Sequence, residues 1–309
     1  MIFEASAHTY IYFLYRHYHR RFSTSGIKED YTIQKTVWIT GASSGLGLAT
    51  AEAFASSGWL VVAGARSFED GKASETKEKN IVRLKLDVTD EESCKRFAEK
   101  ALELSPAVDA LVCGAAVLVL GSCEMTSVEE YRRVMETNFL GSVRMVSYAL
   151  PHMRRQKSGR ILLFSSINGL LGIPFQSAYT ASKHAMEGYA ECLSMETKPY
   201  GIQVCLIEPG DHRGGSDRTR LHAAREDDNS PYKNAYSAAC AVIHRDESGG
   251  LLPEKLGKKV VKNAERKRMK FRLKVAKFDQ RLAVLLHTLL PEWLNSWILR
   301  DYYRGGKKL

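Results

Sequence analysis

Between Lys35 and Gly210, short apolar segments that favour β-strands alternate with longer segments of helical spacing. Strands that are joined by helices of this length must pair in parallel, because each crossover returns the chain to the same end of the sheet. We therefore predict an α/β fold with a doubly wound parallel sheet. The expected strands are Thr36–Thr40, Trp59–Ala65, Ile81–Val88, Ala110–Cys113, Ile161–Ser165 and Val204–Glu208. The expected helices are Leu46–Ser57, Cys94–Leu104, Val128–Leu150 and Ser177–Tyr200.

A glycine-rich turn connects the first expected strand to the first expected helix. Its spacing is G-x-x-x-G-x-G, and an ordinary tight turn is the alternative interpretation. Free backbone N–H groups and the helix dipole favour an anion at a helix N-terminus, and glycine lets a phosphate approach the backbone closely. The turn thus predicts a site for the phosphates of a dinucleotide. The candidate contacts are Gly41, Ser43, Ser44, Gly45, Leu46 and Gly47.

The end of the second expected strand distinguishes the two nicotinamide cofactors. An acidic residue there would bind the ribose 2′-hydroxyl of NAD, but this chain has Ala65-Arg66. The guanidinium of Arg66, with the Ser43 hydroxyl near it, suits a 2′-phosphate, so we predict NADP(H). At the end of the third strand, Asp87-Val88 is expected to contact the cofactor, with the Asp87 carboxylate accepting from the adenine amino group. Capping of the next helix is the competing role for Asp87.

Tyr179 and Lys183 lie four positions apart in an expected helix and therefore share a face. A phenol titrates near a pH of about 10, and an ammonium group within about 6 Å lowers that pKa by favouring the phenolate. Ser166 directly follows an expected strand, at the sheet edge where ligands bind in open α/β folds. Its hydroxyl is suited to hold a substrate oxygen against Tyr179. By itself, the Tyr-x-x-x-Lys spacing is equally compatible with a surface pair.

Taken together, these motifs resemble the short-chain dehydrogenase/reductase superfamily in order and spacing, over Lys35 to Gly210. The stretch Gly169–Lys183 and the long C-terminal tail are similar to the branch that includes 17β-hydroxysteroid dehydrogenases and retinol-type reductases. The residues that carry the resemblance are Gly41-x-x-x-Gly45-x-Gly47, Asp87, Asn138, Ser166, Tyr179-x-x-x-Lys183 and Pro209-Gly210.

The resemblance implies a role for each catalytic position. Tyr179 is implied as the proton donor and acceptor, and Lys183 as the group that lowers its pKa and holds the nicotinamide ribose. Ser166 is implied to orient the carbonyl, and Asn138 to anchor a water that connects Lys183 to solvent. The cofactor contacts implied in this half of the chain are Asn138, Tyr179, Lys183, Pro209 and Gly210. A homo-oligomer formed through Val128–Leu150 and Ser177–Tyr200 is also implied.

Two segments depart from the family pattern. Cys113-Gly114-Ala115-Ala116 stands where the family has Asn-Asn-Ala-Gly, whose first Asn braces the sheet at the cofactor edge. After Pro209-Gly210, many relatives have a small hydroxyl residue that meets the nicotinamide carboxamide, but here Asp211-His212-Arg213 follows. Contact of Asp211 or Arg213 with substrate or cofactor is one interpretation, and a solvated lid is the other.

The composition divides the chain into three segments. We expect an N-terminal extension at residues 1–34, a Rossmann-like NADP-binding catalytic domain at residues 35–253 with a lid at about 211–250, and a basic amphipathic helical tail at residues 254–309. The chain has a net charge of +10, and its last 56 residues hold 16 basic and 5 acidic side chains. This tail is suited to peripheral contact with a membrane. The alternatives are a solvated helical face, and packing on the domain's own substrate cleft or on a partner subunit.

Cysteine spacing and targeting signals bear on location. The six cysteines form no Cys-x-x-Cys pair, which favours reduced thiols in the cytoplasm. An organellar presequence at residues 1–34 is the alternative, because that segment is rich in Arg and Ser. The histidines lack ligand spacing, so no metal site is predicted, and no nucleic-acid partner is expected.

We expect an oxidoreductase that interconverts a ketone or aldehyde and an alcohol on an apolar substrate of steroid, retinoid or lipid type. A reductase of acyl ketones in a lipid pathway is the alternative within enzymes. A regulatory protein that binds NADP without turnover is the alternative of another class.

Overall fold

The computed structural model describes residues 34–69, 80–214 and 220–305. The predicted N-terminal extension therefore lies outside the described residues, apart from Gln34. Within the described helices, none is both long and apolar enough to cross a membrane.

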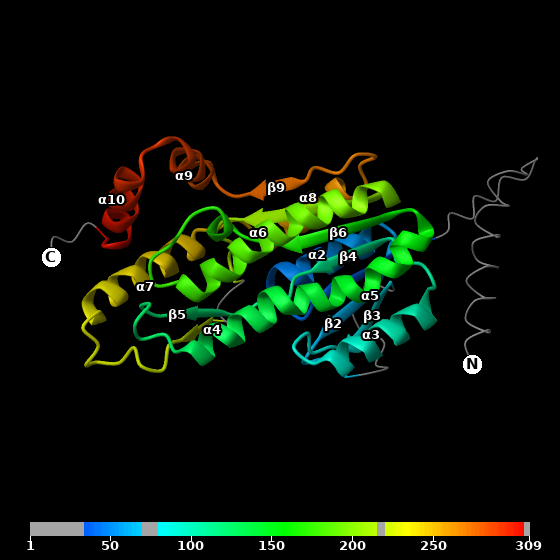
Figure 1. Ribbon diagram of the computed structural model, residues 1–309, viewed down its shortest axis with the longest axis horizontal. Helices are drawn as coiled ribbons and strands as arrows, with labels where there is room; N and C mark the ends of the chain where they lie inside the picture. The colour runs from blue at the N-terminus through cyan, green and yellow to red at the C-terminus, as the bar shows by residue number, and fades with distance from the viewer. Residues whose placement is uncertain (1–33, 70–79, 215–219, 306–309) are drawn as a thin grey trace, which may run out of the picture.

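The predicted doubly wound parallel sheet is confirmed (Figure 1). In the described part of the chain it has seven parallel strands in the order β3-β2-β1-β4-β6-β7-β9. The order runs outward in both directions from β1 and β4, so the sheet changes winding direction between these two strands. The strands are β1 (Thr36–Thr40), β2 (Leu60–Ala65), β3 (Ile81–Lys85), β4 (Ala110–Cys113), β6 (Gly159–Phe164), β7 (Ile202–Pro209) and β9 (Arg272–Val275).

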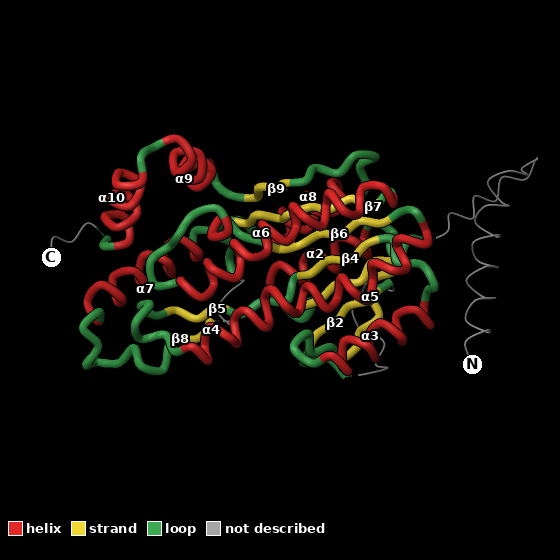
Figure 2. The backbone as a smooth tube through the Cα atoms, in the orientation of Figure 1, coloured by secondary structure: helices red, strands yellow, loops and turns green. Residues whose placement is uncertain are grey.

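Helices cover both faces of the sheet, and each strand alternates its side chains between them. In β1, Trp38 packs in the core under α3, α5 and α6, whereas Val37 and Ile39 pack under α2 and α8. Figure 2 shows α5 and α6 crossing in front of the strands, with α2 behind them. These helices are α2 (Gly45–Ser56), α3 (Glu91–Leu104), α5 (Gly141–Gln156), α6 (Ser177–Thr197) and α8 (Pro253–Ala264).

The predicted helix Val128–Leu150 is divided into two by an irregular turn. Helix α4 (Val128–Met135) begins at a capping box of Ser127 and Glu130, and a π-helical turn, Glu136–Leu140, follows it before α5. Such turns carry one extra residue, so they redirect a side chain without ending the helix. No local pattern of apolar residues marks this turn in the sequence.

The predicted boundary at residue 253 is wrong. Helix α8 packs against α2, and β9 is an edge strand of the main sheet, so both belong to the catalytic domain. Leu256, Val260 and Val261 are buried in the core while the lysines of the helix remain in solvent. Charge alone made this segment resemble a separate tail. Among the described residues beyond β9, the regular elements are α9 (Phe278–Leu289) and α10 (Glu292–Tyr303).

The predicted lid also contains regular structure. Strand β8 (Arg220–His222) pairs with β5 (Leu118–Leu120), and α7 (Lys233–Ser248) follows. Ile243 of α7 packs on Leu118 and Leu120. This small sheet and its helix form one wall beside the carboxyl ends of the main strands.

Gly257 allows the close contact between α8 and α2, because a methyl group there would collide with the backbone oxygen of Ala49. We expect Gly257→Ala to lower the free energy of unfolding by about 1–3 kcal/mol through overpacking. Gly188→Ala on α6 is the matched control, since its methyl group meets open space and should stabilise the helix by about 0.5–1 kcal/mol. Urea denaturation of both variants measures the difference, and equal stability of the two would contradict this account of α8.

Candidate active site

A cavity of about 590 Å³ opens at the carboxyl ends of the central strands. Residues that follow β1, β2, β4, β6 and β7 all line it, and the change of winding direction between β1 and β4 lies at its centre. Ligands bind at this position in open α/β sheets, because the two flanking loops diverge there. All predicted site residues line the cavity except Gly45 and Asn138.

The glycine turn has the geometry of a phosphate site. Gly41 has a φ of +70°, and a Cβ on it would lie 2.7 Å from the backbone of Ala115, so only glycine fits between the two loops. Ser44 precedes α2 in an extended conformation, but its side chain does not cap the helix. The first turn of α2 also has no acidic residue. Its N–H groups are therefore suited to receive the phosphates of a dinucleotide.

Arg66 and Ser43 are exposed and line the same end of the cavity, as predicted. The carboxylate of Asp87 accepts from the backbone N–H of Thr89 at 3.0 Å and from its hydroxyl at 2.8 Å. The competing role predicted for Asp87 is wrong, because Asp90 caps α3 by accepting from Glu92 N–H at 3.0 Å. Asp87 lies three residues too early to reach that helix end.

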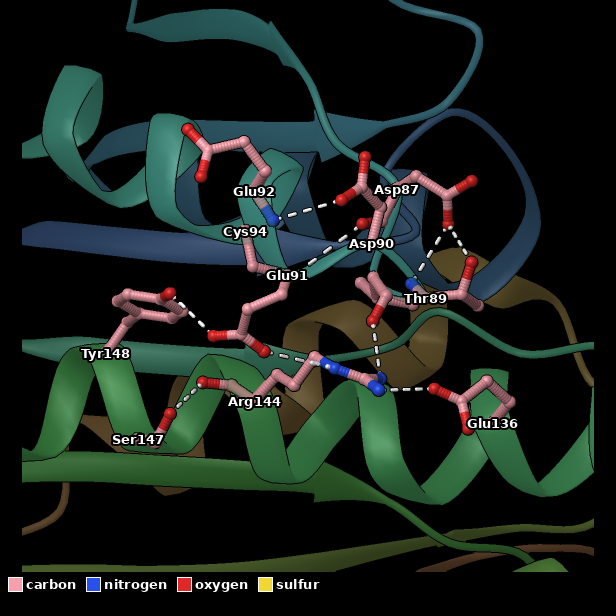
Figure 3. A network of polar contacts seen from close by, with 11 residues as sticks. Asp87, Thr89, Asp90, Glu91, Glu92, Cys94, Glu136, Arg144, Ser147 and Tyr148 are labelled. Atoms are coloured by element: carbon pink, nitrogen blue, oxygen red, sulfur yellow. Dashed lines mark hydrogen bonds and ion pairs between the residues drawn. The ribbon is translucent and has the colours of Figure 1, made fainter.

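A polar network holds the loop that carries Asp87 and Val88 (Figure 3). Arg144 of α5 donates to the backbone oxygen of Val88 at 3.2 Å and pairs with Glu91 and Glu136. Glu91 also accepts from Tyr148 at 2.6 Å. Helices α3 and α5 are thereby tied to the cavity edge at which an adenine ring is expected.

The three predicted catalytic side chains meet on one wall. Tyr179 comes from α6 and Ser166 from the end of β6, and both line the cavity. The Ser166 hydroxyl donates to the Asn168 amide oxygen at 3.2 Å. Lys183 is 2% exposed, donates to the backbone oxygen of Phe164 at 2.6 Å, and lies 5.3 Å from the centre of the Tyr179 ring. The arrangement brings a phenol, a hydroxyl and an ammonium group to one end of the cavity.

Burial shifts the titration of this pair in opposite directions. It raises the pKa of Tyr179 to about 12, against a smaller lowering by the Ser166 hydrogen bond, while Glu247 raises it further. It lowers the pKa of Lys183 to about 8. The lowering of the Tyr179 pKa that the sequence predicted is therefore not seen, because dehydration of the phenolate is the largest effect on this group.

Asn138 lies behind the cavity wall, in the π-helical turn. Its amide accepts from Val117 N–H at 2.8 Å and donates to the Val117 oxygen at 3.0 Å and to Ser182 at 3.0 Å. It thus fixes the loop after β4 against α6. The water relay implied for Asn138 stays a prediction.

The sheet brace that Cys113 lacks is supplied by Thr40. The Thr40 hydroxyl accepts from Gly114 N–H at 3.0 Å and from Ala115 N–H at 3.2 Å, which joins the ends of β1 and β4. Cys113 itself is buried, and burial raises the pKa of its thiol to about 12. The ends of β1 and β4 are therefore joined at the cofactor edge of the sheet although Cys113 stands in place of the family's Asn.

The loop after Pro209 places Asp211 and His212 on the cavity wall, whereas Arg213 is exposed away from it. His212 Nδ1 lies 2.9 Å from the Gly210 oxygen, and its Nε2 is buried without a partner among the described residues. The sequence does not single out His212, because no local pattern around it indicates a place on the cavity wall. No group of three His, Cys, Asp or Glu in the described ranges is placed to hold a metal ion.

The far wall of the cavity comes from the predicted lid and from the C-terminal helices. Helix α7 contributes Asp246 and Glu247, and the pair α9 and α10 contributes Ala283, Leu299 and Tyr303. Gln280 of α9 bonds to Asp211 through both its amide oxygen and its amide nitrogen, which fastens these helices to the active-site loop. Apolar spacing marked the helices, but nothing local showed where they pack.

Comparison with known proteins agrees with this geometry. The family model described as short chain dehydrogenase matches residues 35–223. A 3-ketodihydrosphingosine reductase of Bacteroides thetaiotaomicron is 36% identical over 267 residues, which cover 86% of this chain and 97% of the relative. Human 17-beta-hydroxysteroid dehydrogenase type 1 is 38% identical over 184 residues, 56% of each chain. An alcohol dehydrogenase from the archaeon Thermococcus sibiricus, solved with 5-hydroxy-NADP, matches with a TM-score of 0.64 at 25% identity, over 79% of this chain and 97% of that one.

The glycine turn, the Ser166–Tyr179–Lys183 wall and these matches lead to one conclusion. The chain belongs to the short-chain dehydrogenase/reductase family, and it is an oxidoreductase that acts on CH–OH groups.

Proposed function

We propose that this enzyme reduces the ketone of a long-chain lipid with NADPH. The observation that carries the proposal is that the catalytic wall lines the same cavity as residues of α7, α9 and α10. The match to the 3-ketodihydrosphingosine reductase covers 267 residues. Fewer residues than that precede Ala223, so the match must continue past this residue into the segment that builds the far side of the cavity. The match to the steroid dehydrogenase covers 184 residues, a length that fits before Ala223 without including the far side. This difference favours a lipid ketone over a steroid as the substrate.

In this reaction Tyr179 donates its proton to the carbonyl oxygen, and the Ser166 hydroxyl holds that oxygen in place. The cofactor supplies the hydride. Tyr179 is fully protonated at neutral pH, because burial raises its pKa to about 12, so it is ready to act as the acid. Lys183 is held by Phe164 beside the phenol, where its ammonium group stabilises the phenolate that remains.

The preference for NADPH rests on Arg66 and Ser43. Arg66 directly follows β2, where an acidic residue would select NAD, and Ser43 lies in the glycine turn after β1. The uncapped N-terminus of α2 is suited to the pyrophosphate, and Asp87 to the adenine. Arg66 is exposed and therefore free to fold over a 2′-phosphate.

The substrate class rests on both apolar and acidic lining. Leu171, Ile173 and Leu299 suit a hydrocarbon chain. Burial, together with the carboxylates of Asp246 and Glu247, raises the pKa of Asp211 to about 6, against a lowering by Lys277. The three carboxylates contribute a negative potential to this part of the cavity, which the ammonium group of Lys277 opposes. A ketone with a neighbouring ammonium group, as in a ketodihydrosphingosine, would complement that potential.

A regulatory protein that binds NADP without turnover is the alternative of another class. Its support was the pair of departures at Cys113 and after Pro209. The departure at Cys113 is weak support, because the Thr40 hydroxyl joins the ends of β1 and β4. The complete catalytic wall weakens the support from the second departure, because a pure binding protein has no need of it.

Tyr179→Phe tests catalysis. We expect the wild type to oxidise NADPH with one class in a panel of keto-lipids, steroid ketones and retinoid aldehydes. The variant should be slower by at least about a hundredfold, because the proton donor is lost. Tyr189→Phe is the matched control, a tyrosine of the same helix that stacks on Phe139 outside the cavity. Tight NADPH binding without turnover on any member would support the regulatory alternative instead.

Arg66→Ala tests the cofactor. We expect its Kd for NADPH to rise by about 10- to 100-fold, because a charged contact with the 2′-phosphate is lost, while its Kd for NADH stays unchanged. Arg83→Ala is the control, because Arg83 stacks on Phe68 and does not line the cavity. Fluorescence titration measures both constants, and an equal loss for the two cofactors would refute the 2′-phosphate contact.

Asp211→Asn tests the substrate class. Because the pKa of Asp211 is about 6, its carboxylate gains a proton as the pH falls through that value, and the attraction for an ammonium group is then lost. We expect the KM for an amino ketone to rise about tenfold below this pH, and to be high at every pH in the variant. The deaminated ketone of the same chain length is the control and should show neither change. The same pH profile for both ketones would contradict the assignment.

A further inference from the structure

Helices α9 and α10 present large apolar side chains to solvent. The exposed fraction is 80% for Phe278, 69% for Leu289, 72% for Trp293 and 54% for Trp297. Figure 1 shows the two helices at one end of the molecule, beyond α7 and β9. A contiguous apolar surface of this kind marks an interaction site in a folded protein. We name it the hairpin face, and its residues are Phe278, Leu282, Leu285, Leu289, Trp293, Trp297 and Ile298.

The hairpin face is not needed to hold the two helices on the domain. Phe278, Leu282, Leu285 and Leu289 recur at helical spacing and form one stripe of α9. The opposite side of α9 carries Val284, which is buried against Ile167, Leu171 and Ile173. The inner side therefore anchors the helices, and the outer stripe is left for a partner.

The chemistry of the hairpin face fits the surface of a lipid bilayer. Exposed tryptophans beside leucines are typical of helices that lie at the membrane interface, because the indole ring prefers the headgroup level. Arg281 and Arg300 flank the stripe, although Asp279, Glu292 and Asp301 also lie on these helices. The connection from α8 to β9 adds exposed cations on the edge of the molecule that Figure 1 shows above the sheet. These cations are Arg266, Lys267, Arg268 and Lys270.

Charge also distinguishes a bilayer from a second copy of the chain. A two-fold dimer would bring the hairpin faces of two copies together. The cationic edge of the α8–β9 connection is not part of that face, so such a dimer would leave its charges without an acidic partner. Anionic headgroups complement that edge instead, and each basic side chain near such a surface adds to the attraction.

We propose that the hairpin face docks the enzyme on a lipid bilayer that contains anionic headgroups. The same two helices wall the substrate cavity with Ala283, Leu299 and Tyr303, so docking places the cavity beside the membrane. An apolar substrate then reaches Tyr179 without crossing bulk water, a consequence that rests on the proposed function. The docking itself does not depend on it.

The four tryptophans of the chain supply the measurement. Trp38 and Trp59 are buried in the core, while Trp293 and Trp297 belong to the hairpin face. Vesicles of phosphatidylcholine and phosphatidylserine with brominated acyl chains quench only tryptophans that reach the hydrocarbon boundary. We expect partial quenching and a blue shift with these vesicles, and weaker binding to phosphatidylcholine alone or at high salt.

Leu285→Ser with Leu289→Ser removes apolar area and keeps both reporter tryptophans. We expect vesicle binding to weaken by at least about tenfold, since each lost leucine reduces the buried apolar surface. Leu104→Ser with Val128→Ser is the matched control, because both side chains are exposed on other helices. The unchanged emission of Trp38 and Trp59 confirms folding. Trp293→Ser, followed by vesicle sedimentation, gives a second variant.

Three results would overturn the proposal. The first is an absence of quenching. The second is equal binding by the two double variants, or equal binding to neutral vesicles. The third is a blue shift that grows with protein concentration without vesicles, together with a doubled mass, which would assign the hairpin face to a second copy. None of these readouts needs a substrate. Failure of the proposed reaction can therefore be distinguished from failure of the membrane docking.

Discussion

The whole site depends on the close approach of two loops at the centre of the sheet. Gly41 lies against the backbone of Ala115, and the Thr40 hydroxyl accepts from the N–H groups of Gly114 and Ala115. These contacts hold the ends of β1 and β4 together at the point where the winding direction changes. A side chain on Gly41 would separate the loops, and the N-terminus of α2 would no longer face the cavity. The same few atoms therefore hold the centre of the sheet together and keep the expected phosphate site open.

Dehydration then decides the chemistry on the neighbouring wall. It favours the neutral form of both Tyr179 and Lys183, so it raises the pKa of the phenol and lowers that of the ammonium group. For the phenol, interaction with the Ser166 hydroxyl opposes this shift of the pKa. An acid that is protonated at rest, beside a cation that stabilises its conjugate base, suits the reduction of a carbonyl.

The C-terminal fifth of the chain has more than one structural role. Helix α8 and strand β9 complete the catalytic domain, while α9 and α10 close the cavity and expose the hairpin face. Gln280 joins the two functions, because it bonds to Asp211 in the active-site loop from the first turn of α9. A displacement of α9 and α10 would therefore also move Asp211, which lines the same cavity as the catalytic wall.

Much of the fold and of the catalytic wall could be predicted from the sequence. Alternating apolar segments determine strands and helices locally, and helical crossovers then force parallel pairing, so β1 and β4 were predicted with their observed ends. The four-residue spacing of Tyr179 and Lys183 places them on one helix face whatever surrounds it. The glycine turn and Arg66 were predicted for the same reason, because their positions follow directly from strand ends.

Only the tertiary structure decided the rest, because those features depend on groups that are distant in the sequence. The pKa of Tyr179 depends on burial by many segments, and the hydroxyl that replaces the Asn brace comes from Thr40, which is far from Cys113 in the chain. Basic charge suggested a separate tail, yet the apolar side of α8 belongs to the core, since a helix can bury one face and keep its lysines in water. The sequence by itself determined the sheet and the positions of the predicted catalytic residues along the chain. Packing alone determined the substrate wall and the exposed hairpin face, because no local pattern states which side of a helix meets the protein.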